Sequence, residues 1–281
     1  MKMGKKIITR FAPTPSGFLH MGNVWNLLLV EHIAREQEAR LWLRIDDLDR
    51  ARYRRAYTED IFCVAAWLDI GFDGGPENAT DFEANWSQRH RMQSYQEALH
   101  ALVANGNVFA CTCSRRDVAA ASSQGIYPGT CLHAGIPLDA PDVAWRFRTP
   151  GMCAGSSREA IHPIVRRRDG APAYHIATIV DDVNMGMTHI VRGRDLATST
   201  QLQRVLADAM GGEFKKFSRI RFYHHDLLTT PGGAKLSKSA GSGARSLLSE
   251  DAPPAEDIRR RFATWQKAHV LSPDADSGPD Q

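Results

Sequence analysis

Residues 10–23 read Arg-Phe-Ala-Pro-Thr-Pro-Ser-Gly-Phe-Leu-His-Met-Gly-Asn, and this stretch decides the fold. A short predicted strand runs into a turn rich in proline and glycine, and apolar residues then recur at helical spacing over residues 24–38. A turn at the start of a helix offers backbone N–H groups and the positive end of the helix dipole to an anion. Gly17 and Gly22 let a ligand approach the backbone closely, and we expect His20 to lie over a bound phosphate. An ordinary strand–turn–helix connection with an incidental histidine is the alternative.

The α/β pattern continues outward from this turn. A second strand is predicted over residues 41–45, and amphipathic helices are predicted over residues 57–68 and 89–103. Strand, loop, helix and strand in succession are typical of a parallel sheet with crossover helices. We therefore expect an α/β fold with a Rossmann-type parallel sheet.

Composition divides the chain into four parts. Residues 1–107 are expected to form the first half of a nucleotide-binding domain, and residues 108–150 a small insertion between its halves. Residues 151–271 are expected to form the second half and a short C-terminal helical segment, with a buried strand over residues 173–182. Residues 272–281 lack apolar residues almost entirely and are expected to be disordered.

Composition also limits the class of protein. The chain has 281 residues, of which 43% are hydrophobic and 24% charged, so a core can be buried without disulfides. The longest apolar run, residues 61–68, is far shorter than the ~20 residues of a membrane span, and no signal peptide follows the basic N-terminus. We expect a cytoplasmic protein with no membrane partner. The net charge of +3 permits a polyanionic partner such as RNA but does not require one.

Three of the five cysteines, Cys111, Cys113 and Cys131, lie close together in the predicted insertion. In a cytosolic chain this clustering favours a metal over disulfides. Zinc prefers four tetrahedral ligands and binds thiolates well, and His133 is a chemically easy fourth donor. Three free cysteines are the alternative.

A second candidate for phosphate chemistry is the run Lys-Leu-Ser-Lys-Ser at residues 235–239, in a stretch rich in glycine and serine. Two lysines and two hydroxyls there could neutralise charge that develops on a polyphosphate. A solvated linker with surface lysines is the alternative.

Taken together, the His-x-Gly-Asn turn at residues 20–23 and the lysine run at 235–239 resemble the signature pair of class I aminoacyl-tRNA synthetases. The stretch from Arg10 to Gly17 narrows the resemblance to the glutamyl and glutaminyl branch. Further matching stretches follow in the family's order, at residues 44–49, 173–175, 180–182 and 191–196. The resemblance covers roughly residues 6–245 and implies the α/β catalytic domain of that class.

The resemblance also implies roles for individual residues. The residues implied to contact ATP are His20, Gly22, Asn23, Lys235, Ser237 and Lys238. Among these, His20 and Lys238 are the implied catalytic residues, because they would stabilise charge on the phosphates. The residues implied to contact glutamate are Arg10, Phe11, Ala12, Pro13, Thr14, Asp46, Tyr174 and Arg192.

The charges of glutamate fit such a pocket, which needs a guanidinium for the side-chain carboxylate and an acidic group for the ammonium. One residue departs from the family's pattern, because the family usually has glutamate where this chain has Asp46. The shorter side chain withdraws the carboxylate by about 1.5 Å, so either the backbone shifts or a water bridges the gap. This departure puts the amino-acid specificity in doubt.

The chain ends shortly after the lysine run, as in the short family of glutamyl-Q tRNA(Asp) synthetases. The resemblance to that family implies activation of L-glutamate by ATP with Mg²⁺, without a need for tRNA. It further implies that a monomer transfers glutamate to queuosine in the anticodon of tRNA(Asp). Two rival functions are a synthetase-derived ligase that uses a small molecule or carrier protein, and an inactive RNA-binding relative.

The short family carries a Cys-x-Cys, Tyr-x-x-x-Cys zinc site, and this pattern matches Cys111, Cys113, Tyr127 and Cys131. The resemblance therefore implies one structural Zn²⁺ in the insertion. It favours Tyr127 over His133 as the fourth ligand.

Overall fold

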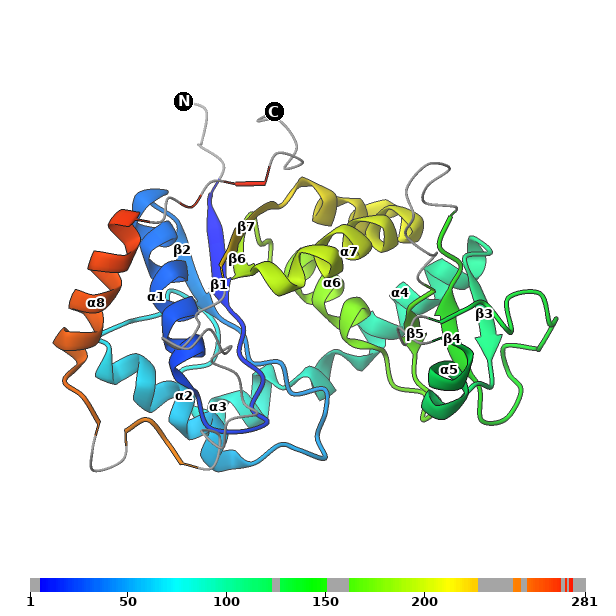
Figure 1. The fold of residues 1–281 in the computed structure, drawn as a ribbon, viewed down its shortest axis with the longest axis horizontal. Helices are drawn as coiled ribbons and strands as arrows, with labels where there is room; N and C mark the ends of the chain where they lie inside the picture. The colour runs from blue at the N-terminus through cyan, green and yellow to red at the C-terminus, as the bar shows by residue number, and fades with distance from the viewer. Residues whose placement is uncertain are drawn as a thin grey trace. The chain divides into compact units, whose positions relative to one another are not determined.

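The computed structural model describes residues 6–122, 127–150, 162–226, 245–248, 252–268, 271 and 273–274. The chain forms two compact units. The first comprises Met1–Arg91, Met185–Thr198 and Arg219–Gln281, and the second comprises Met92–Asn184 and Ser199–Ser218. Figure 1 labels the elements of both.

The first unit holds two pairs of parallel strands. They are β1 (Ile8–Phe11) with β2 (Arg40–Leu43), and β6 (His189–Gly193) with β7 (Arg221–His225). Thr188, which directly precedes β6, joins the two strand pairs through hydrogen bonds to Ile8 of β1. Its N–H donates to the Ile8 carbonyl and its hydroxyl accepts from the Ile8 N–H, both at 2.9 Å. The expected parallel sheet is therefore present, and β1, β6 and β7 lie side by side in Figure 1.

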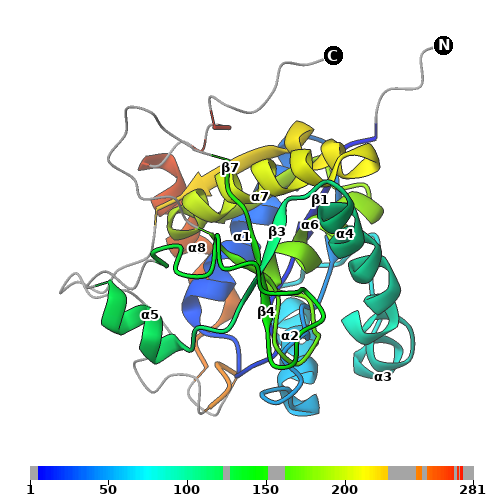
Figure 2. The same cartoon turned by 90° about the vertical axis from the view of Figure 1, so that its right-hand side faces the viewer.

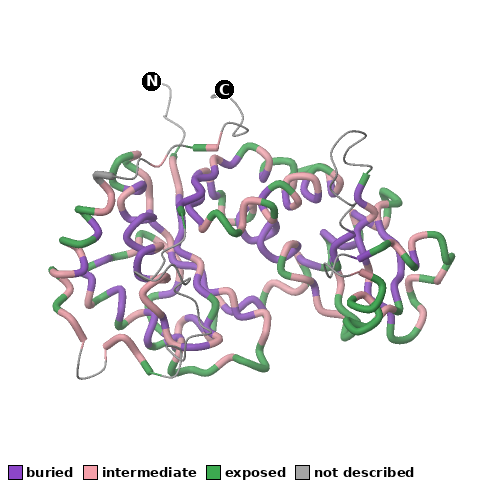
Figure 3. The backbone as a smooth tube through the Cα atoms, viewed as in Figure 1, coloured by how far each residue is buried: buried purple, intermediate pink, exposed green. Residues whose placement is uncertain are grey.

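Helices cover this sheet and bury its apolar residues. They are α1 (Met21–Glu36), α2 (Arg55–Trp67), α3 (Ala79–Asp81) and α8 (Ala255–Ala268), with short helical turns at Phe82–Trp86, Gln88–Arg91 and Arg194–Leu196. α1 is the central helix, and the purple trace in Figure 3 shows how much of it is buried. α8 packs along α1 through Arg259, which pairs with Glu31 at 3.0 Å, and through the rings of Phe262 and Trp25, 5.6 Å apart.

The second unit is built on a small antiparallel sheet. Its strands, in spatial order, are β3 (Val108–Cys111), β4 (Ala144–Phe147) and β5 (Ile164–Arg166). Figure 1 and Figure 2 both show β3 and β4 adjacent. Its helices are α4 (Met92–Ala104), α5 (Arg115–Ala121), α6 (Tyr174–Asn184), most of α7 (Ala197–Met210) and the turn Gly212–Arg219.

The second unit extends beyond the insertion expected at residues 108–150. α4 and α6 belong to it as well, and the buried hydroxyl of Tyr95 on α4 donates to Asp181 on α6 at 2.9 Å. The segment 173–182, expected to be a buried strand, is instead the helix α6, whose residues 176–182 are all buried. Ile176, Ala177 and Val180 lie at helical spacing, but the β-branched residues of the segment favour a strand, and that preference led to the wrong assignment.

The C-terminal segment also differs from expectation at one residue. Asp274, in the part expected to be disordered, donates its N–H to the carbonyl of Phe222 on β7 at 2.9 Å. Its carboxylate lies 2.6 Å from Nδ1 of the buried His224. Among the residues described, no helix combines the length and apolar character needed to cross a membrane.

Candidate active site and cysteine cluster

Reciprocal hydrogen bonds close the turn that precedes α1. His20 caps the helix: its Nδ1 accepts from the N–H of Gly22, and Oδ1 of Asn23 accepts from the N–H of His20, both at 3.1 Å. The N–H of Asn23 donates to the carbonyl of His20 at 2.8 Å. The amides of Gly22 and Asn23 are thus engaged within the turn, and the histidine ring is the better anion-binding group. Because Nδ1 is an acceptor, the neutral ring carries its proton on Nε2 and donates through that atom.

The candidate glutamate residues of the first unit gather at the carboxyl ends of its parallel strands, where open α/β sheets bind ligands. Arg10, the penultimate residue of β1, is 5% exposed, and Arg192, the penultimate residue of β6, is 4% exposed. Pairing continues beyond β1 and β2, because the N–H of Asp46 donates to the carbonyl of Pro13 at 2.9 Å. Asp46 therefore lies beside the Phe11–Thr14 stretch.

Arg44 and Asp46 form a bidentate ion pair. Nε of Arg44 donates to Oδ1 at 2.7 Å, and Nη2 donates to Oδ2 at 3.0 Å. The side chain of Arg44 is 2% exposed and that of Asp46 is 13% exposed. The carboxylate at this position is thus oriented by the buried guanidinium of a residue two positions earlier, just after β2.

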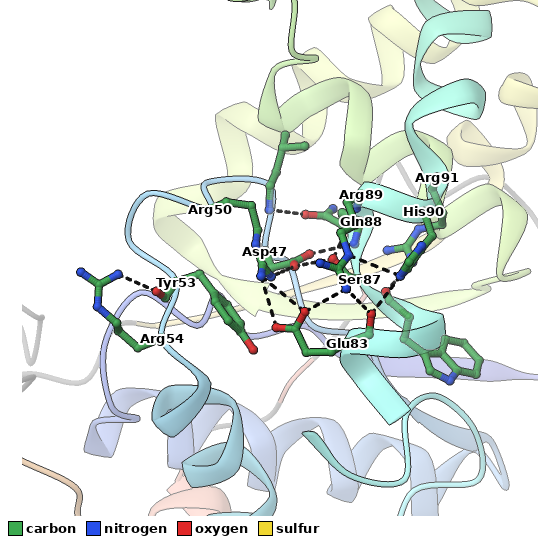
Figure 4. Close-up of polar contacts among 12 residues, drawn as sticks. Asp47, Arg50, Tyr53, Arg54, Glu83, Ser87, Gln88, Arg89, His90 and Arg91 are labelled. Atoms are coloured by element: carbon green, nitrogen blue, oxygen red, sulfur yellow. Dashed lines mark hydrogen bonds and ion pairs between the residues drawn. The ribbon is translucent and has the colours of Figure 1, made fainter. Parts of the chain in front are cut away.

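Asp47, the residue after Asp46, holds the same loop in place through hydrogen bonds to its carboxylate. Its fully buried carboxylate accepts from the hydroxyl of Ser87 and from Nη1 of Arg50, both at 2.6 Å, and from the N–H of Gln88 at 2.8 Å (Figure 4). Oε1 of Gln88 in turn accepts from the N–H of Leu48 at 2.7 Å. These bonds fix the backbone next to the candidate ammonium-binding carboxylate.

Ion pairs partly neutralise the arginine-rich segment that follows. Glu83 pairs with Arg50 at 3.2 Å and with Arg89 at 3.1 Å, and the guanidinium of Arg50 lies 3.7 Å from the ring centre of Tyr53 (Figure 4). Partial burial alone would raise the pKa of Glu83. The Tyr53 hydroxyl and the two arginines outweigh this effect and lower the pKa.

Some sequence-predicted residues are not placed with this group. Tyr174 begins α6 in the second unit and is 45% exposed. Lys235, Ser237 and Lys238 lie outside the described residues.

The cysteine cluster lies at the end of β3 in the second unit. The sulfurs of Cys111, Cys113 and Cys131 lie within 4.8 Å of one another, and those of Cys113 and Cys131 are 3.6 Å apart. Oη of Tyr127 lies 3.5 Å from the sulfur of Cys111 and accepts from the N–H of Cys131 at 2.8 Å. The side chain of His133 is exposed, and no histidine in the described residues joins the cluster. The geometry therefore groups Tyr127, and not His133, with the three thiols.

Two distances in this cluster match those of tetrahedral zinc, and the widest spread of the three sulfurs, up to 4.8 Å, is larger. Zn–S bonds of about 2.3 Å and a Zn–O bond of about 2.0 Å place ligand sulfurs about 3.8 Å apart and a sulfur and an oxygen about 3.5 Å apart. The observed separations of 3.6 Å between two sulfurs and 3.5 Å between sulfur and Oη agree with these values.

The protonation of these groups is uneven without a metal. Burial and the neighbouring sulfurs raise the pKa of Cys113 to about 11, and burial raises the pKa of Tyr127. For Cys131, burial alone would raise the pKa, but hydrogen bonds from the Thr112 backbone and from Tyr127 lower it to about 7. A metal that bound here would displace the remaining protons.

Arg146 on β4 contacts two members of the cluster. Its Nε donates to the sulfur of Cys111 at 3.2 Å, its Cζ lies 3.7 Å from the ring centre of Tyr127, and Nη1 donates to the carbonyl of His162 at 2.7 Å. The residue is 7% exposed. A buried cation therefore lies against the ligand set.

The consecutive histidines at the end of β7 have separate partners. Nε2 of His225 lies 3.1 Å from Nδ2 of Asn26 on α1, and its Nδ1 lies 2.9 Å from the carbonyl of Asp226. The carbonyl requires a proton on Nδ1, so Nε2 accepts from Asn26. His225 thus ties the helix capped by His20 to β7.

Sequence reasoning missed Asp47, Ser87, Asp60 and Arg146. A charged residue in an otherwise apolar helix face was an available signal for Asp60, whose neighbours on α2 include the buried Ile61. Ser87 and Arg146 have partners that are distant in sequence, and Asp47 has both a near partner, Arg50, and distant ones, Ser87 and Gln88.

Comparison with known proteins agrees with this geometry. A family model described as tRNA synthetases class I (E and Q), catalytic domain, matches residues 6–125 and 123–266. The glutamyl-Q tRNA(Asp) synthetase of Rhodobacter capsulatus is 30% identical over 288 residues, which cover 90% of this chain and 99% of that protein. The protein of the same name from Symbiobacterium thermophilum is 36% identical, with 83% of this chain and 78% of that protein covered.

Longer relatives match as well. The glutamate–tRNA ligase of Oleidesulfovibrio alaskensis is 33% identical over 85% of this chain, which spans 52% of that protein. A crystal structure of a glutamate tRNA ligase from Elizabethkingia meningosepticum superposes with a TM-score of 0.72 at 22% identity, covering 92% of this chain and 60% of the other. At that identity the likeness shows the shared fold.

Proposed function

Because this chain belongs to the family of class I tRNA synthetases of the E and Q branch, among relatives named glutamyl-Q tRNA(Asp) synthetase, we propose that it activates L-glutamate with ATP and transfers glutamate to queuosine in the anticodon of tRNA(Asp). The chain is an enzyme of that family. The observation that supports transfer to queuosine is the match to the Rhodobacter capsulatus protein, which extends over 99% of that protein's length.

In this proposal the ends of the parallel strands hold the glutamate. Arg10 and Arg192 supply buried guanidinium groups for a carboxylate, and Asp46 supplies the negative charge for the α-ammonium. Phe11, Ala12, Pro13 and Thr14 line the strand end beside them, and Tyr174 is proposed as a glutamate contact on the family resemblance alone.

The first step joins glutamate to AMP. An oxygen of the α-carboxylate attacks the α-phosphorus of ATP, a new P–O bond forms, the bond to the β-phosphate oxygen breaks, and pyrophosphate leaves. Nε2–H of His20 and the ammonium of Lys238 stabilise the charge that builds on the phosphates. Gly22, Asn23, Lys235 and Ser237 complete the proposed ATP contacts, and Mg²⁺ bound with ATP supplies further charge neutralisation.

The second step transfers the glutamyl group. A hydroxyl of the cyclopentene ring of queuosine attacks the acyl carbon, an ester forms, and AMP leaves. No protein nucleophile is needed, because the mixed anhydride is already activated.

We further propose that Cys111, Cys113, Cys131 and Tyr127 hold one structural Zn²⁺. The support is the grouping of the three sulfurs with Tyr127 and the agreement of two separations, Cys113–Cys131 and Cys111–Tyr127, with tetrahedral coordination. A bound zinc would hold β3, the segment around Tyr127 and the segment around Cys131 together.

A charging assay tests the function. We expect pyrophosphate exchange with glutamate in the absence of tRNA, and transfer of labelled glutamate to tRNA(Asp) only when that tRNA carries queuosine. Exchange without any transfer to tRNA would favour a ligase that uses a small molecule or carrier protein. Exchange that requires tRNA would contradict tRNA-independent activation.

A further inference from the structure

Asp60 on α2 is a buried carboxylate that the proposed chemistry does not use. The residue is 5% exposed. Its Oδ2 accepts from the N–H of Leu19 at 2.8 Å, and its Oδ1 accepts from the hydroxyl of Ser246. Burying a carboxylate is costly unless hydrogen bonds satisfy it, and here two uncharged donors from separate loops do so. One side chain thus joins two segments that are distant in sequence.

The first of these segments carries His20. Leu19 directly precedes it, and the ring of Phe18 packs edge-on against Tyr57, with centroids 5.0 Å apart. Tyr57 lies about one helical turn before Asp60 on α2, so one face of α2 contacts two consecutive residues before the histidine. The reciprocal bonds of the capping turn then fix the ring itself. The position of the imidazole therefore depends on Asp60 through Leu19.

The second segment follows the lysine run in the sequence. Oγ of Ser246 also accepts from the N–H of Leu248 at 3.1 Å, and Leu247 and Leu248 pack against the core of the first unit. The donor to Asp60 is thus part of a short, packed stretch. The carboxylate consequently ties this stretch to the turn that carries the histidine.

We propose that Asp60 is a positioning residue for adenylate formation, because its carboxylate holds the His20 turn and the stretch at residues 245–248 in fixed relation. This inference rests on the proposed function, in which the histidine contacts the phosphates. Small displacements of a catalytic group are costly to the rate. A group that acts mainly in the transition state affects kcat more than substrate binding, so disturbing Asp60 lowers kcat and leaves the KM for glutamate nearly unchanged.

The test is Asp60→Asn in glutamate-dependent pyrophosphate exchange. The two donors bond to different oxygens of Asp60, so in asparagine one of these positions becomes an NH₂ group that cannot accept. Both contacts survive only if the Ser246 hydroxyl reverses from donor to acceptor. We expect kcat to fall about tenfold or more and the KM for glutamate to change less than about twofold. Glu59→Gln is the matched control, because Glu59 is the exposed neighbour on the same helix and pairs with Arg55; its kcat should equal that of the wild type.

Ser246→Ala removes only one of the two donors. We expect a smaller fall in kcat, about threefold, and the double variant should be no slower than Asp60→Asn alone. If Asp60→Asn does not fold, an unchanged kcat in Ser246→Ala overturns the proposal. A folded Asp60→Asn with normal kcat and only a lower melting temperature also overturns it, as does a raised KM for glutamate with normal kcat.

A second measurement is independent of activity. In protein labelled with ¹⁵N-histidine, the signal assigned to His20 by its loss in His20→Gln should shift in Asp60→Asn and not in Glu59→Gln. An unshifted signal overturns the positioning role. Absence of exchange with glutamate in the wild type would overturn the proposed function instead, and the shift would still decide the role of Asp60.

Discussion

Arg44 donates two hydrogen bonds to the carboxylate of Asp46: Nε lies 2.7 Å from Oδ1, and Nη2 lies 3.0 Å from Oδ2. Because the guanidinium is buried, it depends on this carboxylate for its counter-charge. Asp46 therefore has two tasks in the proposed enzyme: it neutralises Arg44, and it supplies the negative charge for the ammonium of glutamate.

Asp46→Asn should weaken both tasks. The amide keeps the size of the side chain but not its charge, so the free energy of unfolding should fall by about 3 kcal/mol. The KM for glutamate should rise about tenfold or more, because a charge-assisted contact is lost. Chemical denaturation and pyrophosphate exchange measure the two effects.

Asp49→Asn is the matched control, because Asp49 belongs to the same acidic stretch but pairs with the exposed Arg52. It should change neither quantity much, since exposed pairs contribute little. Asp46→Glu retains the charge and should keep most of the stability. An unchanged KM for glutamate in Asp46→Asn would remove this residue from the glutamate pocket.

Stability should fall on mild acidification because of the buried histidines. Burial lowers the pKa of His225, opposed by the Asp226 carbonyl and nearby carboxylates, and burial lowers the pKa of His224, opposed by Asp274. In the unfolded chain each histidine binds its proton at about pH 6.5. Below that pH the unfolded state binds more protons than the folded state, so the free energy of unfolding decreases as pH falls.

His225→Asn tests this linkage, because it removes the titrating imidazole while the amide N–H can still donate to the Asp226 carbonyl in place of Nδ1. The variant should lose less free energy of unfolding than the wild type between pH 7 and pH 5, as measured by urea denaturation at each pH. His100→Asn, at an exposed site on α4, is the control. Equal losses in His225→Asn and the wild type would contradict the prediction.

Local sequence signals predicted the parallel sheet and the turn before α1 well. Gly17, Gly22 and the prolines mark a turn, and the apolar period over residues 24–38 marks a helix, so neither depends on distant partners. The segment 173–182 was assigned wrongly, because its β-branched residues favour a strand, although Ile176, Ala177 and Val180 lie at helical spacing. The extent of the second unit depends on the packing of α4 against α6, which has no local signature.

The candidate site likewise combines residues that the sequence indicates with contacts that only the packed fold shows. The resemblance to a family supplied Arg10, Asp46 and Arg192, and the structure brings their strand ends to one edge of the sheet. It could not supply the bond between Asp60 and Ser246, which links positions far apart in the chain. Hydrogen bonds of this kind follow from the packed fold and not from spacing.

Tyr127→Phe should reduce zinc retention, whereas His133→Ala should not. The Tyr127 oxygen lies 3.5 Å from the Cys111 sulfur, and His133 is exposed and outside the cluster. Metal analysis of the purified wild type should find about one zinc per chain. Zinc loss in His133→Ala together with full retention in Tyr127→Phe would assign the fourth position to the histidine.

Arg146→Met should weaken zinc binding about tenfold or more, as loss of an outer hydrogen-bond partner commonly does. Three thiolates and a phenolate carry four negative charges against the two positive charges of Zn²⁺, and the buried guanidinium, 3.2 Å from the Cys111 sulfur, offsets part of the excess. Competition with a chromophoric chelator measures the affinity.

Arg148→Met is the matched control, because Arg148 stacks near Phe109 and donates to the Leu132 carbonyl without contacting a ligand atom. Equal affinities in the two variants would show that Arg146 supports packing and not the metal.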